Sequence, residues 1–220
     1  MFDSGFVFYP TPARPTCHCA SLCELPDGDL LAVWYAGQGE GLGDSALLQA
    51  RFSVADGQWT APEVIVDTPG LSDGNAVLFP TPAGRVWLFH TVIQRHGWDT
   101  VLAYWRQSTN EGLTWSEARL FDPEEGMMFR SRPLALSSGR ILIPAYDEKD
   151  WSSFMYLSDD DGFTWQRSSR LHVSDGCIQP AVVERGDGSL LAYLRCGSRT
   201  GHLWQATSTD GGTSWGDCTP

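Results

Sequence analysis

An eight-residue pattern recurs along this chain at a spacing of fifty residues. "STNEGLTW" begins at position 108, "SDDDGFTW" at 158 and "STDGGTSW" at 208, and a weaker copy, "SVADGQWT", begins at 53. Self-similarity at a fixed period of this length is typical of solenoids and propellers, in which each repeat is one supersecondary unit. The repeat restricts the possible folds more than any other feature of the sequence.

Each copy has the composition of a β-turn. In such turns Ser and Asp side chains accept hydrogen bonds from nearby backbone N–H groups, Gly takes a positive φ, and the Trp packs between neighbouring sheets. A calcium loop of the EF-hand type would need a Glu at its twelfth position and flanking helices. The twelfth position counted from Asp159 is Arg170. We therefore expect the acidic side chains to face solvent, far from any chemistry.

Short apolar runs separated by tight turns fill the space between the copies. The turns "PDGD", "PAGR", "SSGR" and "GDGS" each join two such runs, which predicts hairpins. Four strands about every fifty residues predict an all-β chain, a β-propeller with four-stranded antiparallel blades, of which about four are present. The fourth blade ends at "TSWGDCTP", so its outermost strand should be missing or very short. We expect a fragment of a longer propeller; the alternative is a complete four-bladed ring.

The charge and the termini narrow the classes of partner. The formal net charge is −12. Because a nucleic acid or an anionic membrane requires a basic face, we expect no nucleic-acid partner. The N-terminal residues have neither the basic segment nor the long apolar run of a signal peptide, and no stretch is long and apolar enough for membrane insertion. The expected location is the cytoplasm, with no cofactor and no metal.

Six cysteines stand at positions 17, 19, 23, 177, 196 and 218. The segment "CHCASLC" lacks the spacing of a metal-binding C-x-x-C pair. It falls in an expected strand, where positions 17, 19, 21 and 23 would share one face. We expect ordinary reduced thiols that are partly buried.

The repeats resemble those of a known superfamily. They match the Asp-box pattern S-x-D-x-G-x-T-W of the sialidases, and "HCASLCELPDGDLLAVWYAGQGEGLGD", "RSRPLALSSGRILIPAYDE" and "IQPAVVERGDGSLLAYLRCG" are similar to the sialidase-like branch called the BNR-repeat-like domain. The resemblance covers nearly the whole chain. It implies a six-bladed propeller, so that residues 1–220 form a single domain that is incomplete at its C-terminus. Asp boxes would lie at 108–115, 158–165 and 208–215, with a degenerate one at 53–60.

The resemblance also implies a substrate site. Sialidases hold the substrate carboxylate with three arginines, and use a Tyr nucleophile activated by a Glu, with a separate Asp as acid/base. Arg195, in "LAYLRCG", matches the second arginine, which ends the second strand of such a blade. Gln179 stands where the activating Glu is expected. Because Gln cannot act as a base, this departure counts against classical sialidase chemistry, although Gln179 can still bond a sugar hydroxyl.

Two further matches lie near the N-terminus. The first arginine of the sialidases would fall near His18, and Arg14 lies four residues earlier, so this match is partial. His18 either contacts ligand or transfers a proton, or it is a buried, hydrogen-bonded histidine. Asp44, in "GQGEGLGD", matches the acid/base Asp, and Glu40 is its rival in the same loop. The alternative for both carboxylates is a mobile, solvated acidic loop.

The second and third blades carry further polar candidates. Arg130 and Arg132 precede the inner strand of the third blade, and Arg132 is a second carboxylate-binding candidate. Tyr146 and Glu148 end the next strand, two residues apart on one strand face. In the second blade the candidates are Asp73 and Asn75 at the rim, His90 at the end of the second strand, and His96 and Trp98 in the following loop, where Trp98 is either a sugar platform or packs under the loop.

Together with these residues, the resemblance implies a sialidase-like glycoside hydrolase that acts on a glycoside of an acidic sugar. The alternatives are a non-catalytic carbohydrate-binding propeller, a protein-interaction scaffold, and an acidic-polysaccharide lyase that uses His18, Tyr146 and an Arg. The nucleophile is expected beyond residue 220, and the sugar, the stereochemistry and the oligomeric state are left open. The catalytic candidates are Asp44, Glu40, Glu148 and His18, and the substrate-binding candidates are Arg132, Arg195, Gln179, Arg130, Tyr146 and Asn75.

Overall fold

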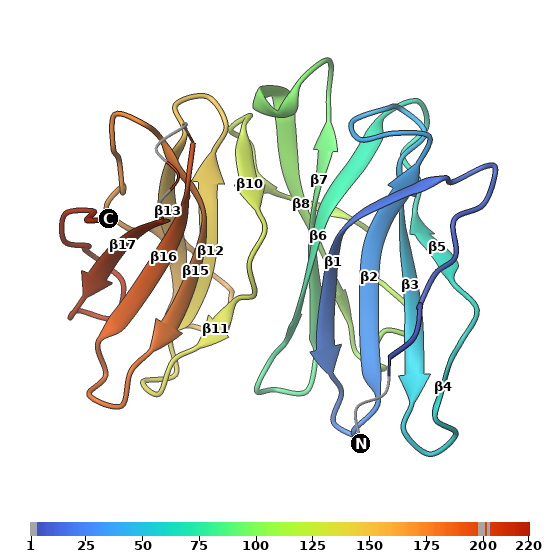
Figure 1. Ribbon diagram of the computed structural model, residues 1–220. Coiled ribbons are helices and arrows are strands. Elements are labelled where there is room, and N and C mark those ends of the chain that lie inside the picture. Colours follow the sequence, from blue (N-terminus) through green and yellow to red (C-terminus); the bar gives the residue numbers. More distant parts are fainter. Residues whose placement is uncertain (1–3, 198–200, 202) are drawn as a thin grey trace. The chain divides into compact units, whose positions relative to one another are not determined.

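The structure is a computed structural model that describes residues 4–197, 201 and 203–220 (Figure 1). Four antiparallel sheets follow one another along the chain, and the described residues contain one short 3₁₀ helix, η1 (Trp98–Thr100), but no α-helix. The predicted all-β class is therefore confirmed. Within this described part, no helix has the length and hydropathy needed to span a membrane. The chain divides between Phe121 and Asp122 into two compact units.

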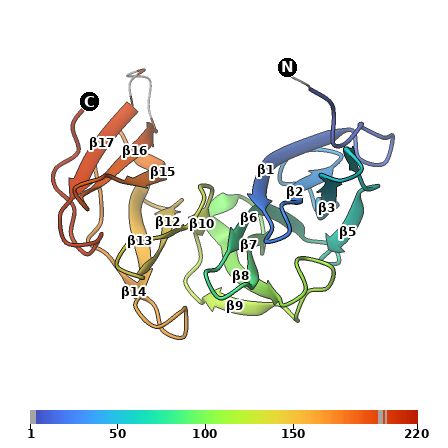
Figure 2. The ribbon, with the colours of Figure 1, turned by 90° about the horizontal axis from the view of Figure 1, so that it is seen from below.

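The first unit contains two sheets, whose first strands lie side by side (Figure 1, Figure 2). Between them the Leu78 N–H donates to Ser21 Oγ at 3.0 Å. The first sheet consists of β1 (Thr16–Glu24), β2 (Leu30–Gly37), β3 (Ala46–Ser53), β4 (Gln58–Trp59) and β5 (Glu63–Val66). The second consists of β6 (Ser72–Pro80), β7 (Val86–Ile93), β8 (Val101–Ser108) and β9 (Arg119–Asp122). Because β4 and β5 share the outer edge of β3, each sheet has four strand positions.

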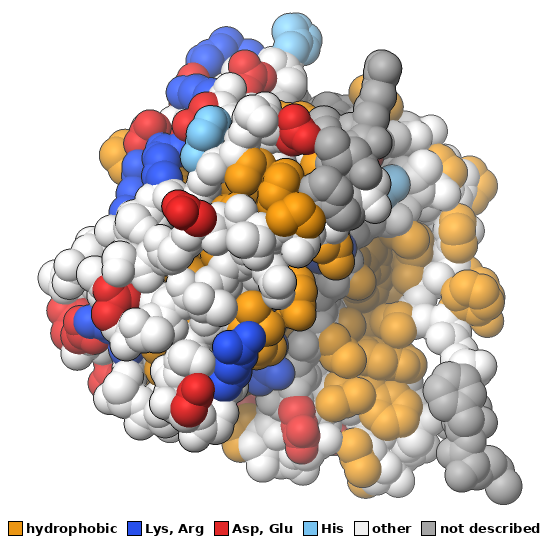
Figure 3. All heavy atoms as spheres, turned by 60° about the vertical axis from the view of Figure 1, so that its left-hand side comes forward, with side chains coloured by type: hydrophobic (Ala, Val, Ile, Leu, Met, Phe, Trp, Pro, Cys, Tyr) orange, Lys and Arg blue, Asp and Glu red, His pale blue; other side chains and the backbone are white. Residues whose placement is uncertain are grey.

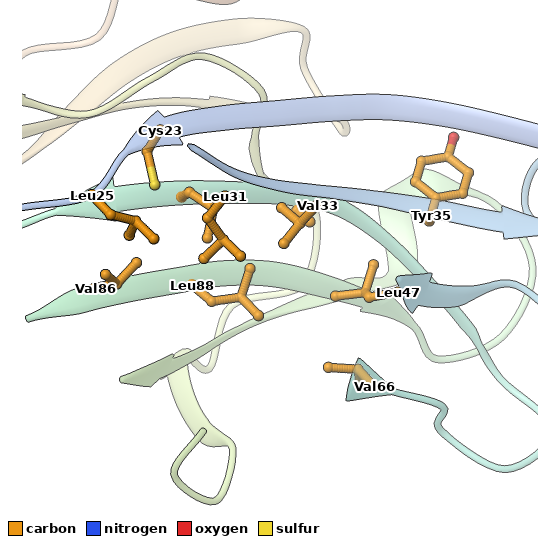
Figure 4. Packing of buried hydrophobic residues seen from close by; sticks show 11 residues of the cluster. Cys23, Leu25, Leu31, Val33, Tyr35, Leu47, Val66, Val86 and Leu88 are labelled. Carbon is orange, nitrogen blue, oxygen red and sulfur yellow. The ribbon is translucent and has the colours of Figure 1, made fainter. Parts of the chain in front are cut away.

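A hydrophobic core fills the space between these two sheets (Figure 4). Alternate residues of a strand share a face, and β2 places Leu31, Val33 and Tyr35 in this core, each no more than 2% exposed. Burial of side chains of this size contributes about 1.5–3 kcal/mol each. Tyr35 lies at one end of the cluster, and its hydroxyl points away from the aliphatic side chains (Figure 4).

The second unit also contains two sheets. One consists of β10 (Met127–Phe129), β11 (Leu134–Ala135), β12 (Ile141–Asp147), β13 (Ser152–Ser158) and β14 (Gln166–Arg167). Its first strand is broken, so β10 and β11 pair with different parts of β12. The other consists of β15 (Cys177–Glu184), β16 (Leu190–Cys196) and β17 (Leu203–Ser208). A single bridge between Gln205 and Thr219 replaces its fourth strand, which is very short, as expected.

The two faces of the β15–β17 sheet differ in exposure. One face contributes Leu190, Ala192 and Leu194, which are fully buried, to the core of the second unit. On this sheet Val183, Tyr193 and Leu203 are 52%, 46% and 58% exposed. Figure 3, in which this side of the molecule comes forward, shows hydrophobic side chains at the surface.

The Asp boxes form the predicted turns. In the box at 158–165, the Gly162 N–H donates to Ser158 Oγ at 2.8 Å, and the Thr164 N–H donates to Asp160 Oδ1 at 2.9 Å. The boxes at 108–115 and 208–215 repeat both bonds, with Asn110 in place of the Asp in the first. The glycine of each box has a φ between 82° and 86°, a conformation that glycine adopts without steric cost.

The tryptophans of two boxes pack as predicted. Trp115 lies against the core of the first unit and donates its Nε1–H to Gln49 Oε1 at 2.9 Å. Trp215 lies against the core of the second unit. Each box follows the end of a third strand, whereas the first strand begins at the opposite edge, where Thr16 pairs with Gly37. The boxes are therefore at the edge of each unit opposite to the beginnings of the first strands.

One expectation about the cysteines is wrong. Positions 17, 19, 21 and 23 do not share a face, because a bulge in β1 shifts the register between His18 and Ser21. Since side chains alternate with a period of two, one extra residue exchanges the faces. Cys17 is exposed opposite Ala36, whereas Cys23 is buried in the core. None of the six cysteines forms a disulfide in the structure.

A partly buried ion pair stabilises the second unit. Arg167 Nη2 and the Tyr156 hydroxyl both donate to Asp122 Oδ2 at 2.5 Å, and the guanidinium lies 5.1 Å from the Phe154 ring centre. Burial alone would raise the pKa of Asp122, but the hydrogen bonds from Tyr156 and Arg167 outweigh burial and hold the pKa below its ordinary value. The charged carboxylate is therefore the stable form in the fold.

Replacing Arg167 by Gln should destabilise the fold by about 2–3 kcal/mol near neutral pH, because a buried carboxylate loses its counter-charge. A carboxylate whose folded pKa lies below the unfolded value stabilises the fold above the unfolded pKa of about 3.9. That contribution is lost as the pH falls through the folded pKa, so the cost of the substitution should shrink below about pH 4. Urea unfolding at neutral and at acidic pH measures the loss in the free energy of unfolding at each pH, with the exposed Arg185→Gln as control. A cost that is equal at the two pH values would contradict the assignment.

Candidate functional site

The first strand of each sheet is interrupted close to the edge where it begins. In β1, β6 and β15 the interruption is a β-bulge that sets two residues opposite one. The first residue of each bulge is not glycine but has a positive φ: Cys19 (53°), Asn75 (43°) and Gln179 (54°). Such backbone conformations cost about 1–3 kcal/mol and concentrate, like bulges, at functional sites.

The candidates predicted from the sequence lie at these interruptions. His18 directly precedes the bulge in β1, and Asn75 and Gln179 occupy the bulges in β6 and β15. Contrary to expectation, Arg130 and Arg132 do not precede the first strand of their sheet, because that strand already begins with β10; they lie in its break, between β10 and β11. In each of the four sheets, the interruption of the first strand therefore carries or adjoins a candidate residue. Two of these sheets belong to each unit.

In the first unit, Tyr35 connects two of the catalytic candidates. The His18 ring stacks on the Tyr35 ring with 5.5 Å between centroids, and the Tyr35 hydroxyl donates to Glu40 Oε1 at 3.2 Å. His18 and Glu40 are exposed, whereas Tyr35 is buried. Burial, together with the neighbouring Cys19 and Glu40, raises the pKa of Tyr35, so the hydroxyl stays protonated and can donate. The buried phenol holds the Glu40 carboxylate at the surface.

Asp44 has a different role in the same loop. Its Oδ2 accepts the Gln38 N–H at 2.9 Å, so the carboxylate closes the loop onto its own backbone. Gln38 Nε2 donates to the Pro12 carbonyl at 2.9 Å, and Arg14 Nη1 donates to the Asp44 carbonyl at 3.3 Å. Asp44 and Arg14 therefore fix the loop that presents Glu40.

The candidates of the second sheet are more buried than expected. Asp73 is fully buried; its carboxylate accepts the Thr68 N–H at 2.7 Å and the Thr68 hydroxyl at 2.8 Å, and burial raises its pKa. Asn75 is 4% exposed. His90 does not end its strand, because β7 continues to Ile93. Burial lowers the pKa of His90 to about 3, so its ring stays neutral where it stacks on Tyr104.

The Trp98 side chain packs against the protein and does not project into solvent. Its ring lies over Gly74, where a Cβ atom would come 3.3 Å from Trp98 Cζ3. The side chain is half-buried against the core of the first unit. Of the two roles considered for Trp98, the structure favours packing under the loop.

In the second unit, the candidates Arg130, Arg132, Tyr146 and Glu148 range from exposed to fully buried. Arg130 is half-buried and Arg132 is exposed, and neither guanidinium has a hydrogen bond or ion pair with any residue that the structure describes. Tyr146 is 1% exposed inside β12. Glu148 is half-buried and directly follows the last residue of that strand, where its N–H donates to the Gly126 carbonyl at 3.0 Å.

Arg195 and Gln179 lie beside one another across β15 and β16. Arg195 is exposed near the end of β16, the second strand of its sheet, as the resemblance implied. It pairs with Ile178, the residue before Gln179. Gln179 is half-buried at the bulge. A guanidinium and an amide side chain are thus carried by neighbouring positions.

Sequence reasoning missed two residues at these edges, Tyr35 and Trp151. Tyr35 looked like one more apolar residue of a buried strand, and only the fold brings its hydroxyl to Glu40. Trp151 lies in a turn with no motif, yet it has a φ of 54° and is 36% exposed. No group of three His, Cys, Asp or Glu side chains in the described part of the chain is placed to hold a metal ion.

Comparison with known proteins assigns a family. Residues 28–220 match the family model described as BNR repeat-like domain. The chain belongs to the BNR repeat-like domain family. It is 30% identical to a sialidase of Micromonospora viridifaciens, over 98% of this chain and 37% of that protein. It is also 35% identical to an anhydrosialidase of Macrobdella decora, over 52% of this chain and 16% of that protein. The chain thus spans well under half the length of these relatives.

A solved structure supports the same fold. The intramolecular trans-sialidase from Ruminococcus gnavus matches with a TM-score of 0.80 and 16% identity, over 98% of this chain and 73% of that one. This BNR chain therefore has the fold of a sialidase-type β-propeller, as the Asp boxes predicted. The extent of its domain, and the roles of its site residues, stay predictions.

Proposed function

We propose that this BNR-family chain is part of a glycoside hydrolase that acts on a glycoside of an acidic sugar. The observation that carries the proposal is the exposed Glu40 carboxylate, which the buried Tyr35 hydroxyl holds at 3.2 Å beside the bulge of β1. A carboxyl group that a hydrogen bond holds in place at the surface is positioned for proton transfer with a bound glycoside. The curated relatives, a sialidase and an anhydrosialidase, indicate the substrate class.

In the proposed mechanism the two units have separate tasks. In the first unit, Glu40 gives its proton to the glycosidic oxygen as the C–O bond breaks, so the alcohol leaves neutral, and water adds to the sugar carbon. His18 contacts the sugar next to Glu40. In the second unit, the Arg132 and Arg195 guanidinium groups are suited to bind a sugar carboxylate, because a planar fork of N–H donors matches two carboxylate oxygens. Glu148 is a further carboxylate of that unit and can accept a hydrogen bond from a sugar hydroxyl.

A specific observation favours a second candidate, a carbohydrate-binding propeller without catalysis. Gln179 occupies the strained position at the bulge of β15, where the resemblance implies an activating Glu. An amide donates and accepts hydrogen bonds, but it does not take up a proton near neutral pH. Gln179 would then bond a sugar hydroxyl in a site that binds glycans without cleaving them.

The test uses the protein at its full natural length. It is incubated with α-sialosides and with uronic-acid glycosides, and release is followed by mass spectrometry and ultraviolet absorbance. We expect release of the acidic sugar with addition of water, and loss of release in Arg195→Ala but not in the exposed control Arg185→Ala. An unsaturated, ultraviolet-absorbing product would instead indicate a lyase. Binding without release would support the second candidate, and neither binding nor release would refute both.

A further inference from the structure

Trp151 has an unusual combination of strain, rigidity and exposure. It lies in the turn between β12 and β13 with a φ of 54°, a left-handed conformation that bulky residues seldom adopt. Its side chain is 36% exposed. Such strain persists only where the surroundings over-determine it, and it is concentrated at binding and catalytic sites. A partly exposed aromatic ring held in this conformation is therefore a candidate for contact with a ligand.

Hydrogen bonds fix the backbone of Trp151 on both sides. The Trp151 N–H donates to the Asp147 carbonyl at 2.9 Å, and the Trp151 carbonyl accepts the Cys177 N–H at 2.8 Å. Arg170 Nη1 braces the same turn through Asp147 Oδ2 at 3.0 Å and Ser152 Oγ at 2.6 Å. The turn is therefore rigid before any ligand arrives.

Two glycines provide the seat for the indole ring. A Cβ atom at Gly197 would lie 2.3 Å from Trp151 Cε3, and one at Gly176 would lie 3.0 Å from Trp151 Cβ. A hydrogen bond joins the two glycines: the Gly197 N–H donates to the Gly176 carbonyl at 3.0 Å. Only residues without a side chain allow the ring to lie this close to both.

The two glycines under the indole ring lie beside the strands that carry the substrate-binding candidates of the second unit. Gly176 immediately precedes β15, which carries Gln179, and Gly197 immediately follows β16, which carries Arg195. Glu148 belongs to the same turn as Trp151. A rigid aromatic plane thus stands at the edge where a carboxylate, an amide and a guanidinium also emerge.

We propose that Trp151 is an aromatic platform that binds the C–H face of a pyranose ring, at the edge of the second unit that carries Gln179 and Arg195. A pyranose presents apolar C–H bonds on one face and hydroxyls at its rim, so an indole with polar neighbours matches it. The rigid turn lowers the entropy lost on binding. This assignment rests on the proposed function in so far as the ligand is a glycan, but it does not require that the glycan be cleaved.

The experiment measures binding of three probes, 3′-sialyllactose, lactose and a galacturonic acid oligomer, by calorimetry and by saturation-transfer NMR. The variants are Trp151→Gly, which removes the ring and relieves the positive φ, and Trp151→Phe, which keeps an aromatic plane. Phe163→Ala is the matched control, because Phe163 is an exposed aromatic residue (82%) of the same unit in an Asp box at its opposite edge. Melting temperatures are recorded for all variants.

We expect Trp151→Gly to weaken binding by about tenfold or more, with loss of saturation on the pyranose C–H protons and no lower melting temperature. Trp151→Phe should stay within about threefold of the wild type, and Phe163→Ala should bind unchanged. Unaltered binding in Trp151→Gly would overturn the proposal, as would a wild-type protein that binds none of the probes. A melting temperature that falls together with binding would show a packing role instead.

The outcomes separate this inference from the proposed function. Binding that depends on Trp151 in a protein that releases no sugar would leave the platform in place and refute the hydrolase. Release of sugar that is indifferent to Trp151→Gly would support the hydrolase and refute the platform.

Discussion

Replacing Glu40 by Gln should lower glycoside turnover by about 10²–10⁴-fold, the range that a positioned general acid contributes. Gln has nearly the shape of Glu, and its Oε1 can still accept the Tyr35 hydroxyl, so the loop should keep its structure. The defect should therefore appear in kcat, with the melting temperature unchanged. Steady-state kinetics on whichever acidic glycoside the wild type cleaves measures the effect.

Two further substitutions serve as controls for Glu40. Asp44→Asn keeps an oxygen that can accept the Gln38 N–H, so its loop should persist and turnover should fall far less. Tyr35→Phe removes the hydroxyl that positions Glu40 and should reduce kcat to an intermediate extent. If Asp44→Asn abolishes turnover while Glu40→Gln does not, the proton donor is Asp44 and the loop rearranges on substrate binding.

Replacing Gly212 by Ala should destabilise the second unit by about 2–4 kcal/mol, through backbone strain and overpacking together. Gly212 has a φ of 86°, and a Cβ atom there would lie 2.8 Å from Leu142 Cδ1 and 3.3 Å from Leu190 Cδ1. Both leucines are fully buried in the core of the unit. Because packed side chains cannot withdraw freely, the added methyl group must displace them.

Gly188→Ala separates the two causes. Gly188 has a φ of 81°, but no atom lies within 4 Å of its hypothetical Cβ. Its substitution should therefore cost only the strain of the left-handed conformation, about 1–2 kcal/mol. Urea unfolding of the two variants gives the difference. Equal costs would mean that the core accommodates the methyl group at Gly212.

The fold could be predicted from the sequence because its signals are local. A Ser side chain that caps a turn, a glycine with positive φ and an apolar hairpin each depend on residues a few positions apart. The boxes at 108–115, 158–165 and 208–215 form the turns that their residues predicted. The position of Arg195 near the end of a second strand was implied by the family resemblance.

The candidate site was only partly predictable, because its contacts are not local. The bulge at Cys19 reversed the expected face of Cys17, and no sequence pattern marks which residue of a strand will be extra. His90 was expected at a strand end but is buried inside β7. Tyr35 and Trp151 carried no motif at all.

The sequence by itself determined that the chain forms all-β propeller sheets with structural turns at one edge. The reason is that strand periodicity and turn formation depend on residues that are close in the sequence. Only the tertiary structure decided that Glu40 is held by Tyr35, that Asp44 closes its own loop, and that Trp151 rests on Gly176 and Gly197. The physical reason is that these contacts depend on strand register and on side chains that meet across sheets and turns. A change of one residue in register redirects every side chain that follows.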